Sequence, residues 1–373
     1  MPEYICQISG KRYSSQEIRW KSEHNGLLDL DFSPKIDLDV LKTRPFNLWR
    51  YRESLPIEDA ASIISFQEGF TPLVEVEIAG RSVALKLDFL FPSGSYKDRG
   101  ASILMSQVKA LGLDKVVQDS SGNAGCAVAA YAAKAGITCK ILVPAATSEG
   151  KLAQISLYGA QLDKVPGSRE ATARAAQWEA EKIYYASHVW NPYFHHGTKT
   201  FAYEVCEQLS WQAPDTVVLP AGNGTLLIGV YIGFKELMEA GIITHFPKLI
   251  GVQSAHCAPL YEAFLAGKNT AKEFQKKATL AEGISIAHPQ RGAQMLAQVR
   301  ESKGRFLAVE EGEIVESLRE MAQMGYYIEP TSAAVIAGLK QYVHHYAEKE
   351  EKIVSVMTGN GLKSTEKMLK ILN

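Results

Sequence analysis

Short apolar runs alternate with longer amphipathic segments along most of the chain after Gly69. The short runs are rich in β-branched residues, as buried strands are, and the longer segments are rich in Ala, Leu, Lys and Glu, as helices are. This pattern predicts parallel sheets covered by helices, and therefore an α/β fold with doubly wound sheets. The predicted strands are 83–87, 115–118, 138–143, 216–219, 248–252 and 353–357, and the predicted helices are 100–110, 124–133, 151–158, 169–183, 225–238, 313–324 and 332–346.

The first 60 residues lack a sustained period of either kind, and we interpret residues 1–60 as an N-terminal extension packed on the main body. The full length of 373 residues is about right for two domains. We expect a large domain built from 61–100 and 199–373, and a smaller, mobile domain at 101–198. In such folds ligands bind in a crevice at the carboxyl ends of the strands.

Composition excludes several classes of function. Hydrophobic residues make up 46% of the 373 residues and charged residues 22%, and the net charge of −1 gives no field that would attract nucleic acid or a membrane. No apolar run reaches the ~20 residues of a spanning helix, and the amino terminus lacks a secretory pattern. The five cysteines are scattered without a CxxC pair. We expect reduced, buried thiols in a cytoplasmic protein with no bound metal.

Four polar or glycine-rich segments interrupt the apolar rhythm at predicted strand ends. In the first, Pro92–Gly100, Lys97 follows a turn of small residues and stands just before a helix. A desolvated lysine amine can attack an aldehyde and form an imine, although a lone lysine there could also simply open the helix at the surface. In the second, Ser120–Gly125, hydroxyl and amide side chains and helix-start N–H groups can cradle a carboxylate or merely cap the helix.

The third segment, Pro220–Thr225, lies between a strand and a helix. Its glycines allow several backbone N–H groups to face one anion, which suits a phosphate, although a plain tight turn has the same composition. Leu227 breaks the GxGxxG spacing, and this disfavours a dinucleotide-dependent dehydrogenase, the main rival for this fold. The fourth segment, Thr358–Lys363, follows the last strand, where Thr358 can offer a hydroxyl to a ring nitrogen.

Taken together and in this order, the four segments resemble those of threonine synthases. These belong to the fold-type-II enzymes that depend on pyridoxal 5'-phosphate (PLP), the tryptophan synthase β-like group. The resemblance runs from about Tyr51 to Lys363 and includes three further motifs, namely Glu68–Leu73, Gly251–Ser254 and Glu329–Ala334. The segment Tyr4–Asp31 is similar to the zinc-ribbon-like start of some threonine synthases, but Cys6 is the only cysteine left in it, which argues against a metal there.

The resemblance implies how the cofactor is held. Lys97 would carry PLP as a Schiff base, Asn123 would hydrogen-bond to the ring hydroxyl, and Thr358 would contact the pyridine nitrogen. A hydroxyl is no counter-charge for that nitrogen, so we expect a weaker electron sink than in transaminases, which favours elimination. The residues implied to hold the PLP phosphate are Gly222, Asn223, Gly224 and Thr225.

The resemblance also implies a small amino-acid substrate and a homodimer of a lyase, while the net charge and composition predict no nucleic-acid or membrane partner. The residues implied to bind the substrate carboxylate are Ser120, Ser121, Gly122 and Ala124.

Two positions depart from the threonine synthase pattern. The family has an arginine in an Asn-Pro-x-Arg segment and a second asparagine in a Gly-Asn-x-Gly-Asn loop, and both are expected to hold the phosphate of O-phosphohomoserine. Phe194 and Leu226 stand at these positions here. An aromatic ring cannot replace the bidentate contact of a guanidinium. We therefore expect O-phosphohomoserine to be a poor substrate, or to be bound by other groups such as His188 or Lys199.

Three functions remain open on these grounds. The first is the threonine synthase reaction, in which γ-elimination from O-phosphohomoserine and addition of water give threonine and phosphate. The second is β-elimination, as in an ammonia-lyase, or β-replacement on a serine-, threonine- or diaminopropionate-like amino acid. The third is a PLP-binding protein without turnover, because such a carrier would also keep Lys97.

Overall fold

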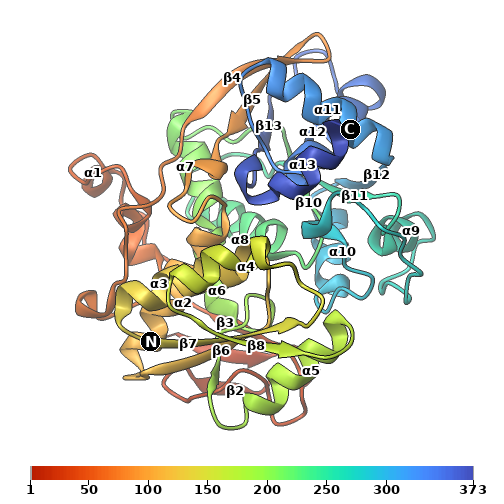
Figure 1. Ribbon diagram of the computed structural model, residues 1–373. Coiled ribbons are helices and arrows are strands. Elements are labelled where there is room, and N and C mark those ends of the chain that lie inside the picture. Colours follow the sequence, from red (N-terminus) through yellow and green to blue (C-terminus); the bar gives the residue numbers. More distant parts are fainter. Residues whose placement is uncertain (1, 373) are drawn as a thin grey trace. The chain divides into compact units, whose positions relative to one another are not determined.

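A computed structural model describes residues 2–372, which form two compact units. Unit 1 comprises the chain up to Phe70 together with Lys97–Thr198, and unit 2 comprises Thr71–Tyr96 and the chain from Lys199 onward. The chain therefore passes from one unit to the other after Phe70, Tyr96 and Thr198. Figure 1 follows this path by colour, from red to blue.

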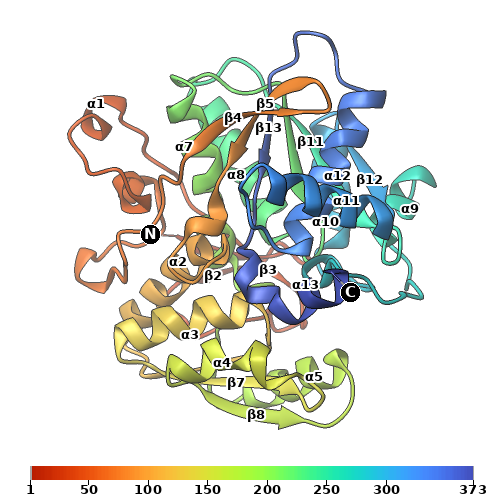
Figure 2. The same cartoon turned by 45° about the horizontal axis from the view of Figure 1, so that its top comes forward.

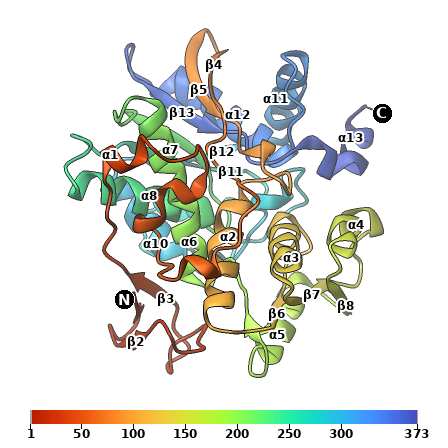
Figure 3. The same ribbon diagram turned by 90° about the vertical axis from the view of Figure 1, so that its left-hand side faces the viewer.

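Unit 1 is built around a four-stranded parallel sheet with the order β8-β7-β6-β9 (Figure 1). The strands are β6 (Lys115–Gln118), β7 (Thr138–Pro144), β8 (Gln161–Val165) and β9 (Tyr184–Tyr185). Five helices belong with it, namely α2 (Lys97–Ala110), α3 (Asn123–Ala135), α4 (Glu149–Leu157), α5 (Arg169–Glu179) and α6 (Pro192–Thr198). Apolar side chains of the sheet and of α2, α3, α4 and α6 form one buried cluster. Figure 3 shows α3 and α4 of this unit beside each other.

The amino-terminal segment of unit 1 is more regular than its sequence suggested. It forms a three-stranded antiparallel sheet of β1 (Glu3–Cys6), β2 (Arg12–Ser14) and β3 (Leu28–Asp31), which the sequence pattern did not indicate. Strands of three or four residues are too short for their alternation to be recognised in sequence. Tyr4 and Cys6 of this segment share a buried cluster with Ile103 and Tyr193 of the same unit.

The rest of this segment contains α1 (Leu38–Leu41) and the 3₁₀ helices η1 (Leu48–Ser54) and η2 (Ala60–Ser62).

Unit 2 contains a six-stranded sheet with the order β12-β11-β10-β13-β5-β4. All neighbours are parallel except β4 and β5, which are joined by a tight turn. Both turn residues have positive φ, 53° at Ala79 and 74° at Gly80, as a two-residue hairpin turn requires. The strands are β4 (Leu73–Ile78), β5 (Arg81–Lys86), β10 (Thr216–Pro220), β11 (Lys248–Ser254), β12 (Arg305–Val309) and β13 (Ile353–Val356).

The helices of unit 2 pack along this sheet. Helix α12 contacts β10, β11, β12 and β13, and Figure 2 shows α11 beside it. The helices are α7 (Thr200–Gln208), α8 (Thr225–Glu239), α9 (Pro259–Leu265), α10 (Gly292–Glu301), α11 (Glu311–Gln323), α12 (Pro330–His345) and α13 (Thr365–Leu372), with 3₁₀ helices η3 (Asp88–Leu90), η4 (Glu282–Ile284) and η5 (Gly361–Ser364).

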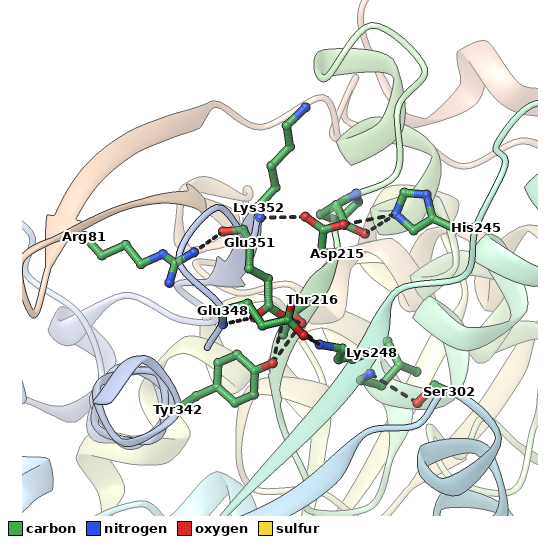
Figure 4. A network of polar contacts seen from close by, with 12 residues as sticks. Arg81, Asp215, Thr216, His245, Lys248, Ser302, Tyr342, Glu348, Glu351 and Lys352 are labelled. Atoms are coloured by element: carbon green, nitrogen blue, oxygen red, sulfur yellow. Dashed lines mark hydrogen bonds and ion pairs between the residues drawn. The ribbon is translucent and has the colours of Figure 1, made fainter. Parts of the chain in front are cut away.

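A polar network lies at the amino-terminal ends of the parallel strands of unit 2 (Figure 4). The buried carboxylate of Glu351 accepts hydrogen bonds from the Thr216 hydroxyl, from the Tyr342 hydroxyl at 2.8 Å and from Lys248 Nζ at 3.3 Å. Arg81 donates to the Glu351 carbonyl oxygen at 2.7 Å. This network ties strand starts together, at the edge of the sheet opposite to the glycine-rich loops.

The predicted fold class is confirmed, since both large sheets are parallel-rich and alternate with helices. Each predicted strand and helix is present, with ends that differ by a few residues. All five cysteines are buried, as expected. Within residues 2–372, none of the helices combines the length and the apolar character that crossing a bilayer requires.

Candidate active site

Lys97 is the first residue of α2, and the ring of Phe194 lies beside this helix start. The centroid of that ring is 5.9 Å from Lys97 Nζ. A Cβ at Gly100 would lie 2.2 Å from the Phe194 ring, and one at Gly197 would lie 2.1 Å from the Arg99 carbonyl oxygen. Helix α6 can therefore pack on the first turn of α2 only because both positions are glycine. Phe194 is fully buried in this contact.

The Ser-Gly-Asn loop follows β6 and opens α3. Ser120 accepts a hydrogen bond from the Gly122 backbone at 3.3 Å, and the first helical residue is Asn123. A Cβ at Gly125 would lie 1.9 Å from the Ser120 carbonyl oxygen, so a larger residue would push the loop away from the helix. The first N–H groups of a helix have no partner within the helix, and here they follow directly after the Ser120 hydroxyl and the Gly122 backbone.

His188 follows β9, the strand next to β6 in the same sheet. Since the two strands are parallel, the loops at their carboxyl ends are neighbours, and the Gln118 side chain bridges them by donating to the Ala186 carbonyl oxygen at 2.9 Å. His188 is 4% exposed, and its Nδ1 has no hydrogen-bond partner among the described residues. Burial, followed by the charges of Lys97 and Arg169, lowers the pKa of His188 well below its usual value, so the ring is neutral near pH 7.

Arg169 begins α5 at the same edge of the sheet, because α5 follows the carboxyl end of β8. Its charge acts on two groups that flank the Ser-Gly-Asn loop. One is His188. The other is Asp119, whose pKa is raised by burial, an effect that Arg169 partly offsets. A cation at the first position of a helix opposes the macrodipole, so Arg169 brings no local benefit to α5. No sequence motif singled out Arg169, because its neighbours become visible only in the folded sheet.

In unit 2, the loop Ala221–Gly224 connects β10 to the start of α8. Gly224 has φ +82°, and a Cβ there would lie 2.6 Å from Met295 Sδ. A Cβ at Gly222 would lie 2.9 Å from the Gly283 carbonyl oxygen. Glycine is therefore required at both position 222 and position 224. The loop brings backbone N–H groups together at the start of a long helix. This is the arrangement that binds phosphate.

Tyr96 supports the same loop. Its hydroxyl is 2.8 Å from Thr225 Oγ1, the side chain that begins α8, and its backbone N–H donates to the Thr358 carbonyl oxygen at 2.9 Å. Burial raises the pKa of Tyr96, which keeps the hydroxyl neutral. The residue before Lys97 therefore connects the Gly222–Thr225 loop with the Thr358 segment.

Thr358 is fully buried at the end of β13, where its hydroxyl meets two other side chains. Its Oγ1 donates to Glu329 Oε1 at 2.9 Å and lies 2.8 Å from Ser332 Oγ. The sequence assigned a role to Thr358 but none to Glu329 or Ser332, although both lie in a motif shared with threonine synthases. The motif could be recognised in the sequence, but the contact of its side chains with Thr358 could not.

Lys199 is buried in unit 2, where its Nζ is 2.8 Å from Glu236 Oε1. Glu236 also accepts a hydrogen bond from the Tyr203 hydroxyl. Leu226, next to Thr225, is buried in α8. Lys199 and Leu226 are thus both packed in the interior of unit 2. The sequence suggested His188 and Lys199 as substitute phosphate ligands. Of these two, only His188 has a buried side-chain atom that lacks a hydrogen-bond partner within the described residues.

A match to a known protein family identifies the class of enzyme. The family described as "Pyridoxal-phosphate dependent enzyme" matches residues 64–359, and the chain is a PLP-dependent enzyme. Threonine synthase of Methanocaldococcus jannaschii is 35% identical over 97% of this chain and 93% of its own length, and threonine synthase of Mycobacterium tuberculosis H37Rv is 34% identical over 86% and 89%. The chain belongs to the threonine synthase family of PLP-dependent lyases.

Solved structures show the same fold. The processed form of threonine deaminase isoform 2 from Solanum lycopersicum superposes with a TM-score of 0.71 at 22% identity, covering 91% of this chain and 90% of that one. A fungal L-serine ammonia-lyase from Rhizomucor miehei gives a TM-score of 0.70 at 22% identity, covering 81% and 97%. The predicted fold-type-II architecture is thereby confirmed.

The residues present fit PLP. The two required glycines at the start of α8 form a cradle suited to its phosphate, Lys97 offers an amine at a helix start, and Thr358 offers a buried oxygen. When bound, PLP withdraws electrons from the amino group of a substrate and so makes its neighbouring C–H bonds acidic.

Proposed function

We propose that this enzyme catalyses the threonine synthase reaction, releasing phosphate from O-phosphohomoserine and forming threonine. The observation that carries the proposal is the arrangement in unit 1, where the Ser-Gly-Asn loop, a neutral buried histidine and an arginine all follow the carboxyl ends of strands in one sheet. The threonine synthases that align over most of the chain support it.

The proposed roles follow from the chemistry of each group. Lys97 provides the amine that holds the cofactor and the base that moves the substrate Cα proton. Asn123 binds the ring hydroxyl, and Thr358 faces the ring nitrogen. The PLP phosphate is held by Gly222, Asn223, Gly224 and Thr225. The substrate carboxylate is held by Ser120, Ser121 and the backbone at Gly122 and Ala124.

Recognition of the substrate phosphate needs a cation, because burying a dianion without compensation costs several kcal/mol. Phe194 offers none, and Lys199 is neutralised by Glu236 at 2.8 Å. In this proposal Arg169, at the carboxyl edge of the unit 1 sheet, supplies the cation, and His188 at the same edge assists as a neutral group. Arg169 contributes charge, and the unpartnered Nδ1 of His188 contributes a hydrogen bond.

A substrate panel tests this function. Purified holoenzyme is given O-phosphohomoserine, L-serine, L-threonine and 2,3-diaminopropionate, and phosphate, threonine and 2-oxo acid are measured. The proposal expects phosphate and threonine in equal amounts from O-phosphohomoserine. Absence of phosphate release with rapid formation of 2-oxo acid would contradict it, and absence of both products would indicate a PLP-binding protein without turnover.

A second candidate is β-elimination from an uncharged amino acid such as serine or threonine. The observation that favours it is Phe194, which places a buried aromatic ring where the family pattern has an arginine. An apolar wall beside Lys97 suits a short, uncharged side chain better than a phosphate ester. The same panel separates the two candidates.

The proposed dimer of identical chains and the proposed movement of the smaller domain stay predictions. Closure of that domain would exclude water from a reactive carbanion. Crystal structures with and without a substrate analogue test the movement, and unchanged domain positions would contradict it. Sedimentation of the holoenzyme tests the dimer.

A further inference from the structure

The side chain of Gln253 links the glycine-rich loop of unit 2 to the start of α9. Gln253 belongs to the Gly251–Ser254 motif and is fully buried in β11. Its Nε2 donates to the Ala221 carbonyl oxygen at 2.9 Å, and its Oε1 accepts from the backbone N–H groups of Leu260 at 2.9 Å and Tyr261 at 3.0 Å. Both ends of the amide therefore bind backbone groups that come from other segments.

Helix α9 fixes the orientation of this amide. The first N–H groups of a helix have no acceptor inside it, and Ala258, which precedes α9, has no side chain that could supply one. Gln253 provides the missing acceptor, because two N–H groups of the first turn meet its Oε1. A carbonyl oxygen can accept both hydrogen bonds, whereas an NH₂ group can accept neither. The NH₂ end must therefore face the Ala221 carbonyl oxygen.

The contact with Ala221 sets the direction of the next backbone N–H. The carbonyl of Ala221 and the N–H of Gly222 belong to one planar peptide unit, and residues 2–372 contain no cis peptide bond. In a trans unit the C=O and N–H bonds point in opposite directions. The N–H of Gly222 therefore points away from Gln253. The preceding N–H, that of Ala221, is held as well, since it donates to the Val252 carbonyl oxygen at 2.8 Å.

The N–H groups of the loop itself are left for a ligand. Within the part of the chain that the structure describes, the N–H groups of Gly222, Asn223 and Gly224 donate no hydrogen bond. Gly222 and Gly224 are buried, and a Cβ at Gly222 would lie 2.9 Å from the Gly283 carbonyl oxygen. Buried N–H groups are almost always paired, and consecutive ones at a helix start are typical of an anion site.

We propose that Gln253 is a positioning residue that holds the Ala221–Gly222 peptide with its N–H turned toward the phosphate of PLP. The inference rests on the proposed function, in which this loop holds that phosphate. Helix α9 fixes Gln253, and Gln253 fixes the peptide. The loop is therefore shaped for the phosphate before the cofactor binds, so no binding free energy is lost in turning the peptide. This gives the Gly251–Ser254 motif a role that its pattern alone did not indicate.

The test compares two cofactors that differ in the phosphate. Wild type, Gln253→Met and Gln107→Met are freed of PLP and titrated with PLP and with pyridoxal, and the dissociation constants are measured from the absorbance of the bound cofactor. Gln253→Met removes both hydrogen-bonding ends of the side chain. Gln107→Met is the matched control, because Gln107 is a buried amide of unit 1 that also donates to a backbone carbonyl oxygen, that of Ser15, at 3.1 Å.

For Gln253→Met we expect about tenfold weaker binding of PLP and unchanged binding of pyridoxal, because an oriented N–H contact with the phosphate is lost. A general loosening of the fold would weaken both cofactors alike. A ratio of the two dissociation constants that is the same in Gln253→Met and in the wild type would overturn the inference. The same would follow if Gln107→Met changed this ratio equally.

A crystal structure of the wild-type holoenzyme is a second test, which needs no variant. We expect a phosphate oxygen of PLP at hydrogen-bonding distance from the Gly222 N–H, with Gln253 bound to the Ala221 carbonyl oxygen. A peptide turned the other way, or Gln253 bound elsewhere, would overturn the inference while leaving the phosphate site in place. PLP with its phosphate in another loop would contradict the proposed site as well. Phosphate release from O-phosphohomoserine tests the proposed substrate independently.

Discussion

Lys199 and Glu236 form an ion pair in the interior of unit 2, with 2.8 Å between Nζ and Oε1. Burial lowers the pKa of Lys199 and raises that of Glu236, and their mutual attraction opposes both shifts. The pair joins the start of α7 to α8, two helices in contact. The lysine that the sequence offered as a ligand for the substrate phosphate is therefore engaged in holding two helices together.

Removing one partner of this pair should destabilise the protein strongly. For Lys199→Met we expect a loss of about 3–5 kcal/mol, because a buried carboxylate is left uncompensated. In Lys199→Met combined with Glu236→Gln most of the loss should be recovered, since both charges are gone and the amide still accepts from Tyr203. Thermal denaturation of the three proteins measures this. Equal losses in the single and double variants would show that packing, and not charge, sets the cost.

Lys97→Ala should abolish turnover while some PLP remains bound through the glycine loop of α8. Borohydride treatment of the wild type should bleach the visible band and attach the pyridoxyl group to one lysine. Peptide mass spectrometry identifies the site, and a label on any lysine other than Lys97 would refute the assignment. Lys363→Ala serves as a control, because that lysine lies close to Ser93 in the polar segments but has no proposed contact with the cofactor aldehyde.

Glu351 should make stability sensitive to acid. Burial alone would raise the pKa of Glu351, but hydrogen bonds from Thr216, the Glu348 backbone and Tyr342 outweigh it and hold the pKa below its usual value. A carboxyl with a lowered folded pKa stabilises the protein above the unfolded value, about 4.3, and loses this effect as the pH falls through the folded pKa.

Glu351→Gln should therefore cost roughly 1.5–3 kcal/mol at pH 7, the range for hydrogen bonds to a charged group. The difference in melting temperature between variant and wild type should shrink as the pH falls below about 4. A difference that stays constant down to pH 3 would mean that the ionisation of Glu351 contributes nothing.

Sequence patterns were sufficient for the elements that repeat a clear period. The strand Lys115–Gln118 lies where it was predicted, and α8 begins at Thr225 as expected. Elements of two to seven residues, such as β1, β2, β9 and α6, were missed because they carry too little periodicity, and the longer α7 and α10 were not predicted either. Glycine positions were also informative, since Gly222 and Gly224 are required by close contacts.

Contacts between segments distant in sequence could not be predicted. Thr358 and Glu329 are 29 residues apart, and their hydrogen bond depends on how α12 begins beside β13. His188 and Arg169 flank the Ser-Gly-Asn loop only because β6, β8 and β9 end at one edge of the same sheet. In the proposed site, the parallel sheet thus brings together residues that have no recognisable spacing in the sequence.

Arg169 should strengthen the binding of a substrate that carries a phosphate or phosphonate group. With a non-cleavable phosphonate analogue of O-phosphohomoserine, Arg169→Gln should bind about tenfold more weakly or worse, since a charged hydrogen bond is worth roughly 1.5–3 kcal/mol and 1.4 kcal/mol is a factor of ten. Binding of norvaline, which has no charged end, should not change. Arg174→Gln, on the same helix, is the control. If both variants weaken binding of the phosphonate analogue equally, the effect comes from the overall positive charge of the helix and not from a contact made by Arg169.

Phe194→Arg tests whether the aromatic ring has displaced a phosphate ligand. The ring is fully buried, with its centroid 5.9 Å from Lys97 Nζ, so an arginine there would bring a guanidinium toward the reacting end of the substrate. If O-phosphohomoserine is a poor substrate for the wild type, Phe194→Arg should raise kcat/KM for phosphate release at least tenfold, because one bidentate contact to phosphate is restored.

The outcome depends on which protein group binds the substrate phosphate in the wild type. Efficient phosphate release by the wild type together with a loss in Phe194→Arg would show that Arg169 and His188 already fill this role, since a second guanidinium near Lys97 would lower the pKa of its amine and crowd the first turn of α2. Phe194→Leu is the control for packing, because it keeps an apolar side chain against Gly100. If Phe194→Leu and Phe194→Arg change phosphate release equally, position 194 acts through the shape of the helix contact and the idea of a displaced ligand is wrong.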